Sequence, residues 1–191
     1  MPTATDSSLL DTHRFDVEAY HRMGDMGLFE GQHVELLKGE IVDMSPINAR
    51  HASMVRLLNE LLSERLDAAY QLSVQNPIRL DSYTEPEPDL AVLHRRADYY
   101  AEAHPGPKDT LLLIEVADSS LERDEQVKLP LYAKAQIPEV WIVNLRDQQL
   151  VRYWGPSPDG YAHIHILKRG DTLPHELIGQ LDLSRLFPKS V

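Results

Sequence analysis

Two acidic residues lie within or beside stretches of sequence that are typical of buried β-strands. Asp89 belongs to PEPDLAVL at 86–93, and Glu115 belongs to LLLIEVA at 111–117. Because a buried carboxylate is costly unless another group compensates its charge, each of these acids requires an explanation. On neighbouring strands the two would form a hard, oxygen-rich site that suits Mg²⁺ or Mn²⁺. The alternative is that each acid caps a loop or pairs with a nearby arginine.

Lys128 is a third candidate for chemistry. It lies on a helix predicted from about 121 to 136, four residues after Asp124 and four before Tyr132, so that Lys128 and Tyr132 share one face. A lysine beside a metal site can orient an attacking water or stabilise charge on a scissile phosphate. The alternative is a solvated surface lysine that pairs with Asp124.

Glu35 and His51 are further candidates, from the N-terminal part of the chain. Glu35 lies beside a predicted hairpin, and His51 opens a long predicted helix. A carboxylate or a neutral imidazole could join a metal site. For His51 the alternative is a role at the helix start.

Several other chemistries lack their sequence signatures. The chain has no cysteine, which removes disulfides, Cys-ligated zinc and thiol catalysis together. No phosphate-binding glycine loop, HExxH zinc helix or GxSxG nucleophile turn occurs. Ser119 and Ser120 are interpreted as helix N-cap residues. For His163 and His165 an exposed strand face is favoured over a metal-binding pair.

Composition predicts a soluble protein in the cytoplasm with no membrane contact. Of 191 residues, 42% are hydrophobic and 26% are charged, and the longest apolar runs have the length of a strand. The chain opens with a polar, acidic stretch that does not resemble a leader sequence. We expect a disordered tail at 1–13 and a single domain at 14–191.

The net charge of −11 opposes one class of function. Proteins that hold nucleic acid by bulk electrostatics are usually basic, because neutralising phosphates supplies most of their non-specific affinity. An acidic chain can still bind nucleic acid at a local site. The charge therefore argues against indiscriminate binding only.

The elements that must position these residues follow from hydrophobic periodicity. The first elements are a helix near 16–29 and a hairpin around Lys38 and Gly39. A helix at 48–69 and strands at 70–75, 86–93 and 111–117 follow. The helix at 121–136, with a kink expected at Pro130, then leads to strands at 137–144, 150–154 and 161–167. We expect the amphipathic C-terminal tail to pack back on the body. The order αβββαβ predicts an α/β fold with a mixed sheet flanked by helices.

This ordered set of motifs resembles a known family. VELLKGEIVDMSP, His51, PEPDLAV, LLLIEVADSS and DEQVKLPLYAKAQIPEVWIVN are together similar to the Uma-type family of restriction endonucleases, in the PD-(D/E)XK nuclease superfamily. The resemblance spans residues 14 to 170. It implies the restriction endonuclease-like core, with an N-terminal helix and hairpin and extra C-terminal strands.

The resemblance also implies roles for particular residues. Asp89 matches the superfamily's "PD" aspartate and Glu115 its acidic second position, but Ala117 stands where the superfamily has lysine. Lys128 resembles a migrated lysine, and its spacing to Tyr132 is similar to the QxxxY helix motif of RecB-like nucleases. The implied metal ligands are Asp89, Glu115 and Glu35, with the backbone carbonyl of Val116 as a further ligand.

The predicted function is a Mg²⁺-dependent or Mn²⁺-dependent DNA endonuclease, active as a homodimer that pairs two sites. Asp89, Glu115 and Lys128 are its expected catalytic residues, with His51 and Tyr132 as accessory residues. Two alternatives stay open. One is a non-catalytic binding or regulatory module on the same fold, and the other is a metal-dependent hydrolase of RNA or nucleotides.

Overall fold

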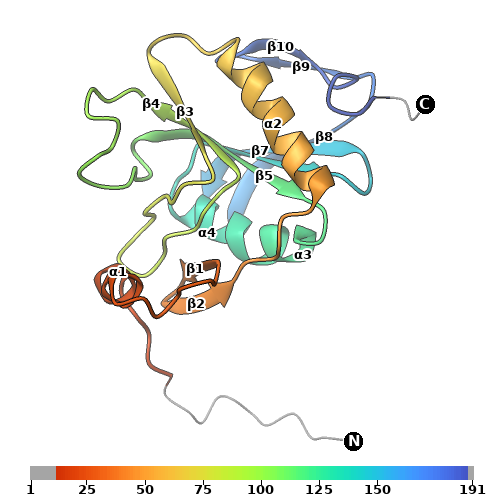
Figure 1. The fold of residues 1–191 in the computed structure, drawn as a ribbon. Coiled ribbons are helices and arrows are strands. Elements are labelled where there is room, and N and C mark those ends of the chain that lie inside the picture. The colour runs from red at the N-terminus through yellow and green to blue at the C-terminus, as the bar shows by residue number, and fades with distance from the viewer. Residues whose placement is uncertain (1–11, 189–191) are drawn as a thin grey trace, which may run out of the picture.

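A six-stranded sheet forms the centre of the structure, a computed structural model that describes residues 12–188 (Figure 1). Its strands are β3 (Tyr70–Val74), β4 (Leu90–His94), β5 (Thr110–Ala117), β6 (Glu139–Asn144), β7 (Gln149–Ser157) and β8 (Gly160–Lys168). They lie in the order β3-β4-β5-β6-β7-β8, and only β5 and β6 run parallel to each other. The predicted mixed sheet is therefore confirmed.

Helices cover the two faces of this sheet (Figure 1). Helix α2 (Ala49–Ser63) lies on one face, where it packs with β3, β5 and the C-terminal segment. The crossover helix between β5 and β6 lies on the other face. The order α2, β3, β4, β5, crossover helix, β6 is the expected αβββαβ.

The continuous apolar run in β5 is explained by burial on both faces. Leu112, Ile114 and Val116 point into the core cluster with α2. Leu113 and Ala117 point into the second cluster, on the side of the crossover helix. Since side chains alternate along a strand, Glu115 faces the crossover helix as well.

The crossover helix differs from the single kinked helix expected at 121–136. It consists of α3 (Leu121–Arg123), a π-helical turn at Asp124–Lys128, and α4 (Leu129–Lys134). The backbone N–H of Leu129 donates to the carbonyl of Asp124, a span of five residues. Pro130 has no N–H and its ring would clash with the carbonyl four residues earlier, so a wider turn relieves the strain that we expected to appear as a kink.

An N-terminal helix and hairpin lie below the sheet in Figure 1, as expected. They are α1 (Val17–Asp25), β1 (Val34–Leu37) and β2 (Glu40–Asp43). Lys38 and Gly39 both have positive φ, 54° and 81°, which is the backbone of a tight two-residue hairpin turn. A bridge between Leu36 and Glu85 attaches the hairpin to the segment that leads into β4.

The C-terminal segment packs back on the body, as predicted. Its hairpin of β9 (Thr172–His175) and β10 (Gly179–Asp182) adds Leu173 and Leu181 to the core cluster around α2. Of the tail expected at 1–13, residues 1–11 lie outside the described residues. No helix within 12–188 is long and apolar enough to cross a membrane.

Candidate functional site

Asp89 and Glu115 meet at one end of the β4–β5 pair. The two strands are antiparallel, with Leu90 opposite Ile114. Continuing this register by one residue places Asp89, just before β4, opposite Glu115. The two acids are 26 positions apart in the sequence, and the pairing of β4 with β5 brings them to the same end of this strand pair, as the sequence predicted.

Glu115 is buried and shares its carboxylate with the crossover helix. Its Oε1 accepts a hydrogen bond from the Tyr132 hydroxyl at 2.5 Å and one from Lys128 Nζ at 3.3 Å. Burial raises the pKa of Glu115 to about 8; Lys128 opposes this rise, and Asp124 and Asp89 add to it. Lys128 therefore does not fully compensate the negative charge of the Glu115 carboxylate.

Lys128 is buried, with 4% of its surface exposed, so the alternative of a solvated surface lysine is wrong. Its ammonium contacts Glu115 Oε1, Glu35 Oε2 at 3.1 Å and the carbonyl of Glu87 at 3.3 Å. Burial alone would lower the pKa of Lys128, but Glu115, Glu35 and Asp124 together raise it. Lys128 is thus a charged lysine beside Glu115, as the sequence predicted. It comes from the crossover helix, whereas the lysine of the superfamily pattern would stand on β5 at the position of Ala117.

Glu35, on β1, also lies beside the ammonium of Lys128. Its Oε2 accepts a hydrogen bond from the backbone N–H of Glu87 at 3.1 Å and pairs with Lys128. Its Oε1 is buried without a hydrogen-bond partner in the described structure. A buried carboxylate oxygen left in this state is available to a ligand.

Asp89 is fixed by three donors. Its Oδ2 accepts from the backbone N–H of Val116 at 2.8 Å and is hydrogen-bonded to His51 Nε2 at 3.1 Å, and its Oδ1 accepts from Gln75 at 3.3 Å. The hydrogen bond to the Asp89 carboxylate raises the pKa of His51, against an opposing effect of burial. His51 lies in the first turn of α2, which explains how a helix on one face of the sheet reaches the acids at the ends of β4 and β5.

Asp124 is a member of this cluster that sequence reasoning treated only as a surface partner for Lys128. It is buried and accepts a hydrogen bond from the Ser120 hydroxyl at 2.7 Å. Burial raises the pKa of Asp124, while Lys128 and Ser120 lower it. Ser120 does occupy the predicted N-cap position, but its hydroxyl bonds to this side chain and makes no capping bond to the helix backbone.

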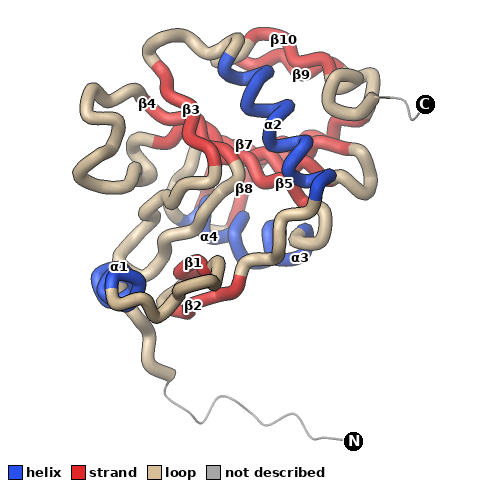
Figure 2. Tube along the Cα trace, in the orientation of Figure 1, coloured by secondary structure: helices blue, strands red, loops and turns tan. Residues whose placement is uncertain are grey.

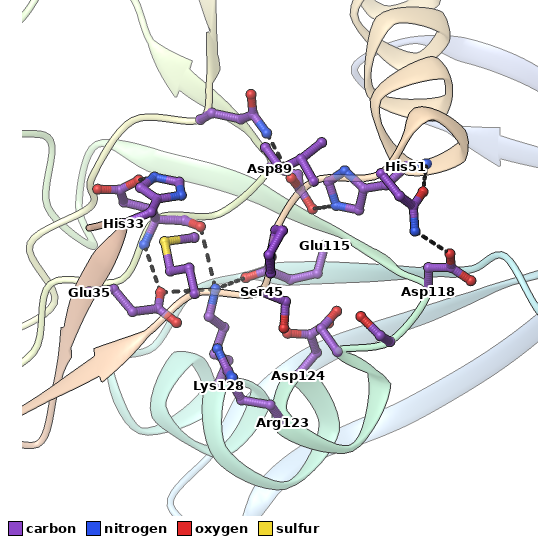
Figure 3. A pocket seen from close by; sticks show the side chains of 18 residues that line it. His33, Glu35, Ser45, His51, Asp89, Glu115, Asp118, Arg123, Asp124 and Lys128 are labelled. Atoms are coloured by element: carbon purple, nitrogen blue, oxygen red, sulfur yellow. Dashed lines mark hydrogen bonds and ion pairs between the residues drawn. The ribbon is translucent and has the colours of Figure 1, made fainter. Parts of the chain in front are cut away.

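These residues line a cleft with a volume of about 70 Å³ (Figure 3). Lys128 points up between Glu35 and Glu115, and Asp89 and His51 lie on the opposite side. Six carboxylates, on Glu35, Glu87, Asp89, Glu115, Asp118 and Asp124, line the cleft, against the ammonium of Lys128 and the guanidinium of Arg123. This surplus of negative charge, together with the free Oε1 of Glu35, fits a divalent cation with oxygen ligands.

The structure brings together every candidate site residue from the sequence. Tyr132 is buried beneath Glu115, and its pKa is raised well above its usual value by burial and by that acid. Val116 contributes a contact through its N–H to Asp89; the metal-ligand role of its carbonyl stays a prediction. Spacing pointed to Asp124 only as a surface partner of Lys128 and gave no signal for Glu87, whose place depends on an irregular segment before β4.

Comparisons with known proteins identify the family of the chain and agree with its fold. Residues 17–186 match the Uma2 family, whose description is "Putative restriction endonuclease", and the chain belongs to this family. The resemblance found in the sequence is thereby confirmed.

A solved structure has the same fold. It is described as that of a putative nuclease belonging to DUF820 from Anabaena variabilis. Its TM-score is 0.69 at 11% sequence identity, and the match covers 91% of this chain and 97% of that chain. No curated protein matches the chain.

Proposed function

We propose that the protein is a Mg²⁺-dependent nuclease that hydrolyses phosphodiester bonds in DNA. The observation that carries this proposal is that Asp89, Glu115, Glu35 and Lys128 line one cleft, where Lys128 pairs with Glu35 and Glu115. Membership of the restriction endonuclease family supports it. Mn²⁺ would serve the same ligands.

Asp89, Glu115 and Glu35 would hold the cation. When bound, it supplies a water of lowered pKa and neutralises charge on the phosphate. Glu35 offers an oxygen without a partner, and Asp89 offers an Oδ1 whose one bond, from Gln75, is long at 3.3 Å. The carbonyl of Val116 is the further ligand we propose.

The other residues of the cleft position these ligands and stabilise charge. Tyr132 and Lys128 both donate to Oε1 of Glu115, which fixes the orientation of that carboxylate. His51 and the backbone N–H of Val116 do the same for Oδ2 of Asp89. The Lys128 ammonium would stabilise charge that develops on the phosphate oxygens during attack.

Arginines at the rim of the cleft would provide local positive charge for binding DNA, although the net charge of the chain is −11. Arg123 lines the cleft, and the side chains of Arg50 and Arg146 are 53% and 64% exposed beside Asp118. Arginines here would contact phosphates of a strand laid across the acidic centre. The affinity for DNA would therefore be local and dependent on salt.

The direct test is cleavage of plasmid and single-stranded DNA by the purified chain with Mg²⁺ or Mn²⁺. We expect cleavage that EDTA abolishes and that Asp89→Asn removes without loss of folding. Asp159→Asn, on the exposed turn between β7 and β8, is the matched control and should cleave like wild type. Absence of cleavage together with absence of Mn²⁺ binding in calorimetry would contradict the proposal.

The same assay separates the two alternatives. A binding or regulatory module would hold DNA equally well as wild type and as Asp89→Asn, with no cleavage by either. A hydrolase of RNA or nucleotides would cleave those substrates in preference to DNA, again with sensitivity to EDTA. The proposed homodimer, which would pair two sites for a double-strand cut, is checked by light scattering.

A further inference from the structure

A second group of possible metal ligands lies away from the cleft. His21 on α1, Glu85 in the segment before β4, and His104 in the loop between β4 and β5 each place one ligand atom within 4.8 Å of the others. The two long loops that flank β4 are drawn in tan in Figure 2. The three residues are separated by 64 and 19 positions, so the sequence offered no signal for this cluster.

Glu85 is the central member, and its charge is incompletely compensated. Its side chain is 1% exposed, and Oε1 is hydrogen-bonded to His21 Nε2 at 2.5 Å. Oε2 is buried and has no hydrogen-bond partner within the described structure. Because a buried carboxylate oxygen without a partner is destabilising, this side of Glu85 points to a missing ligand.

His104 completes the group from an exposed loop. Its ring lies 6.0 Å from that of His21 between centroids, at an interplanar angle of 76°. The loop is tied to the body because Arg79 N–H donates to the Pro105 carbonyl at 2.9 Å. Next to the three residues is a hollow of about 300 Å³, which leaves room for an ion and a water.

The other charged groups around this hollow do not satisfy Glu85. Arg79 lines the hollow, but its guanidinium pairs with Glu18. Glu102 lines it as well and adds negative charge. The surroundings therefore favour a cation next to Glu85.

We propose that His21, Glu85 and His104 bind a divalent transition-metal ion, with Zn²⁺ as the best match. Two imidazoles and one carboxylate are typical zinc ligands, whereas Mg²⁺ favours oxygen ligands alone, such as those of the cleft. Tetrahedral zinc holds its ligand atoms ~3.3 Å apart, so the three side chains need only small movements to close on the ion. Water fills the fourth position.

The ion would join α1, the loop carrying His104 and the segment that runs from Glu85 to Asp89. It is a different site from the cleft and does not depend on the proposed nuclease activity. Its role would be to fix the N-terminal helix and this loop against the segment that carries Asp89. The site is accessible at His104, which allows loading of the folded protein.

The test is calorimetric titration of Zn²⁺ into the full chain carrying Asp89→Asn and Glu115→Gln, which disables the cleft. We expect one Zn²⁺ per chain and a loss of affinity of at least about tenfold on adding His104→Ala. His163→Ala, an exposed histidine on β8, is the matched control and should leave binding unchanged. His104 lies on an exposed loop, so its removal should not prevent folding.

A spectroscopic readout identifies the geometry. Co²⁺ bound by this site should show the strong visible absorption of a four-coordinate ion, and His104→Ala should abolish that absorption. Zn²⁺ should raise the thermal midpoint of the protein with His104 intact and leave the His104→Ala variant unchanged. Zn²⁺ binding that is absent, or that is equal in the His104→Ala and His163→Ala variants, would overturn the proposal.

Discussion

Two buried glutamates on neighbouring strands of the same sheet have opposite electrostatic surroundings. Glu139 begins β6, and its carboxylate accepts hydrogen bonds from Trp141 Nε1 at 2.6 Å and from Arg152 at 2.8 Å, with His175 Nε2 at 3.2 Å. Burial alone would raise the pKa of Glu139, but His175, Arg152 and Trp141 together lower it. Glu139 is therefore stable as a buried anion.

Glu115, near the C-terminal end of the adjacent β5, has no such compensation. It shares Lys128 with Glu35 and lies near Asp89 and Asp124, and its pKa rises to about 8. Both glutamates are almost fully buried, so burial does not distinguish them. The number of donors does: Glu139 has three, whereas Glu115 has two and shares one of them, Lys128, with Glu35. The resulting surplus of negative charge lies at the proposed metal site.

The largest expected effect is on cleavage. Glu115→Gln removes a proposed metal ligand and should lower the rate of DNA cleavage by about 10³-fold or more, equivalent to about 4 kcal/mol in the barrier. Glu139→Gln should stay within about threefold of wild type. Rates of plasmid nicking under single-turnover conditions measure both. Equal losses in the two variants would remove the functional difference between the glutamates.

For the free energy of unfolding, the Glu139→Gln variant should show the larger loss and the Glu115→Gln variant the smaller one. Glu139→Gln leaves the guanidinium of Arg152 without its counter-charge and should cost about 2–3 kcal/mol of the free energy of unfolding. Glu115→Gln should cost less than about 1 kcal/mol at pH 8 in EDTA, because it relieves an uncompensated buried charge. Urea unfolding of both variants provides the comparison. A larger loss for Glu115→Gln would show that Lys128 compensates Glu115 fully.

The pH dependence of stability should sharpen the same contrast. The folded pKa of Glu115, about 8, lies above the ordinary value of 4.5, so between these values the folded state binds more protons than the unfolded state. Glu115 therefore contributes stability that is present below about pH 4.5 and is lost as the pH rises through 8.

The effect is measured as the difference in unfolding free energy between wild type and Glu115→Gln from pH 5 to 9 in EDTA. The stability of wild type relative to the variant should fall with rising pH, with a slope that approaches about 1.4 kcal/mol per pH unit. Glu139, whose pKa is lowered, should give the opposite sign in the corresponding Glu139→Gln comparison at acidic pH. A flat difference for Glu115 would mean that it is ionised throughout.

The smallest expected effect concerns cation affinity. Lys128→Met removes the ammonium that pairs with Glu35 and Glu115, so Mn²⁺ should bind about fivefold more tightly, about 1 kcal/mol, while cleavage falls. Calorimetry of the variant with Mn²⁺ measures the affinity. Weaker binding would indicate that Lys128 chiefly holds Glu35 and Glu115 in place.

Much of the fold could be predicted from local patterns. The apolar run of β5, the helical spacing of α2 and the turn at Lys38 and Gly39 depend on neighbours along the chain, and the structure confirms all three. The crossover helix is the exception, because strain at Pro130 can be relieved by a kink or by a π-helical turn. Helical periodicity does not distinguish these outcomes.

The sequence by itself determined the family and the order of the elements, and it predicted that Asp89 and Glu115 would meet if their strands were neighbours. The structure shows that these strands are adjacent, with Leu90 opposite Ile114. Only the tertiary structure decided that Lys128 is buried between Glu35 and Glu115. Only the tertiary structure brought Glu85 to His21 and His104. The physical reason is that burial and charge compensation depend on the distances between side chains from remote segments, which spacing along one chain does not encode.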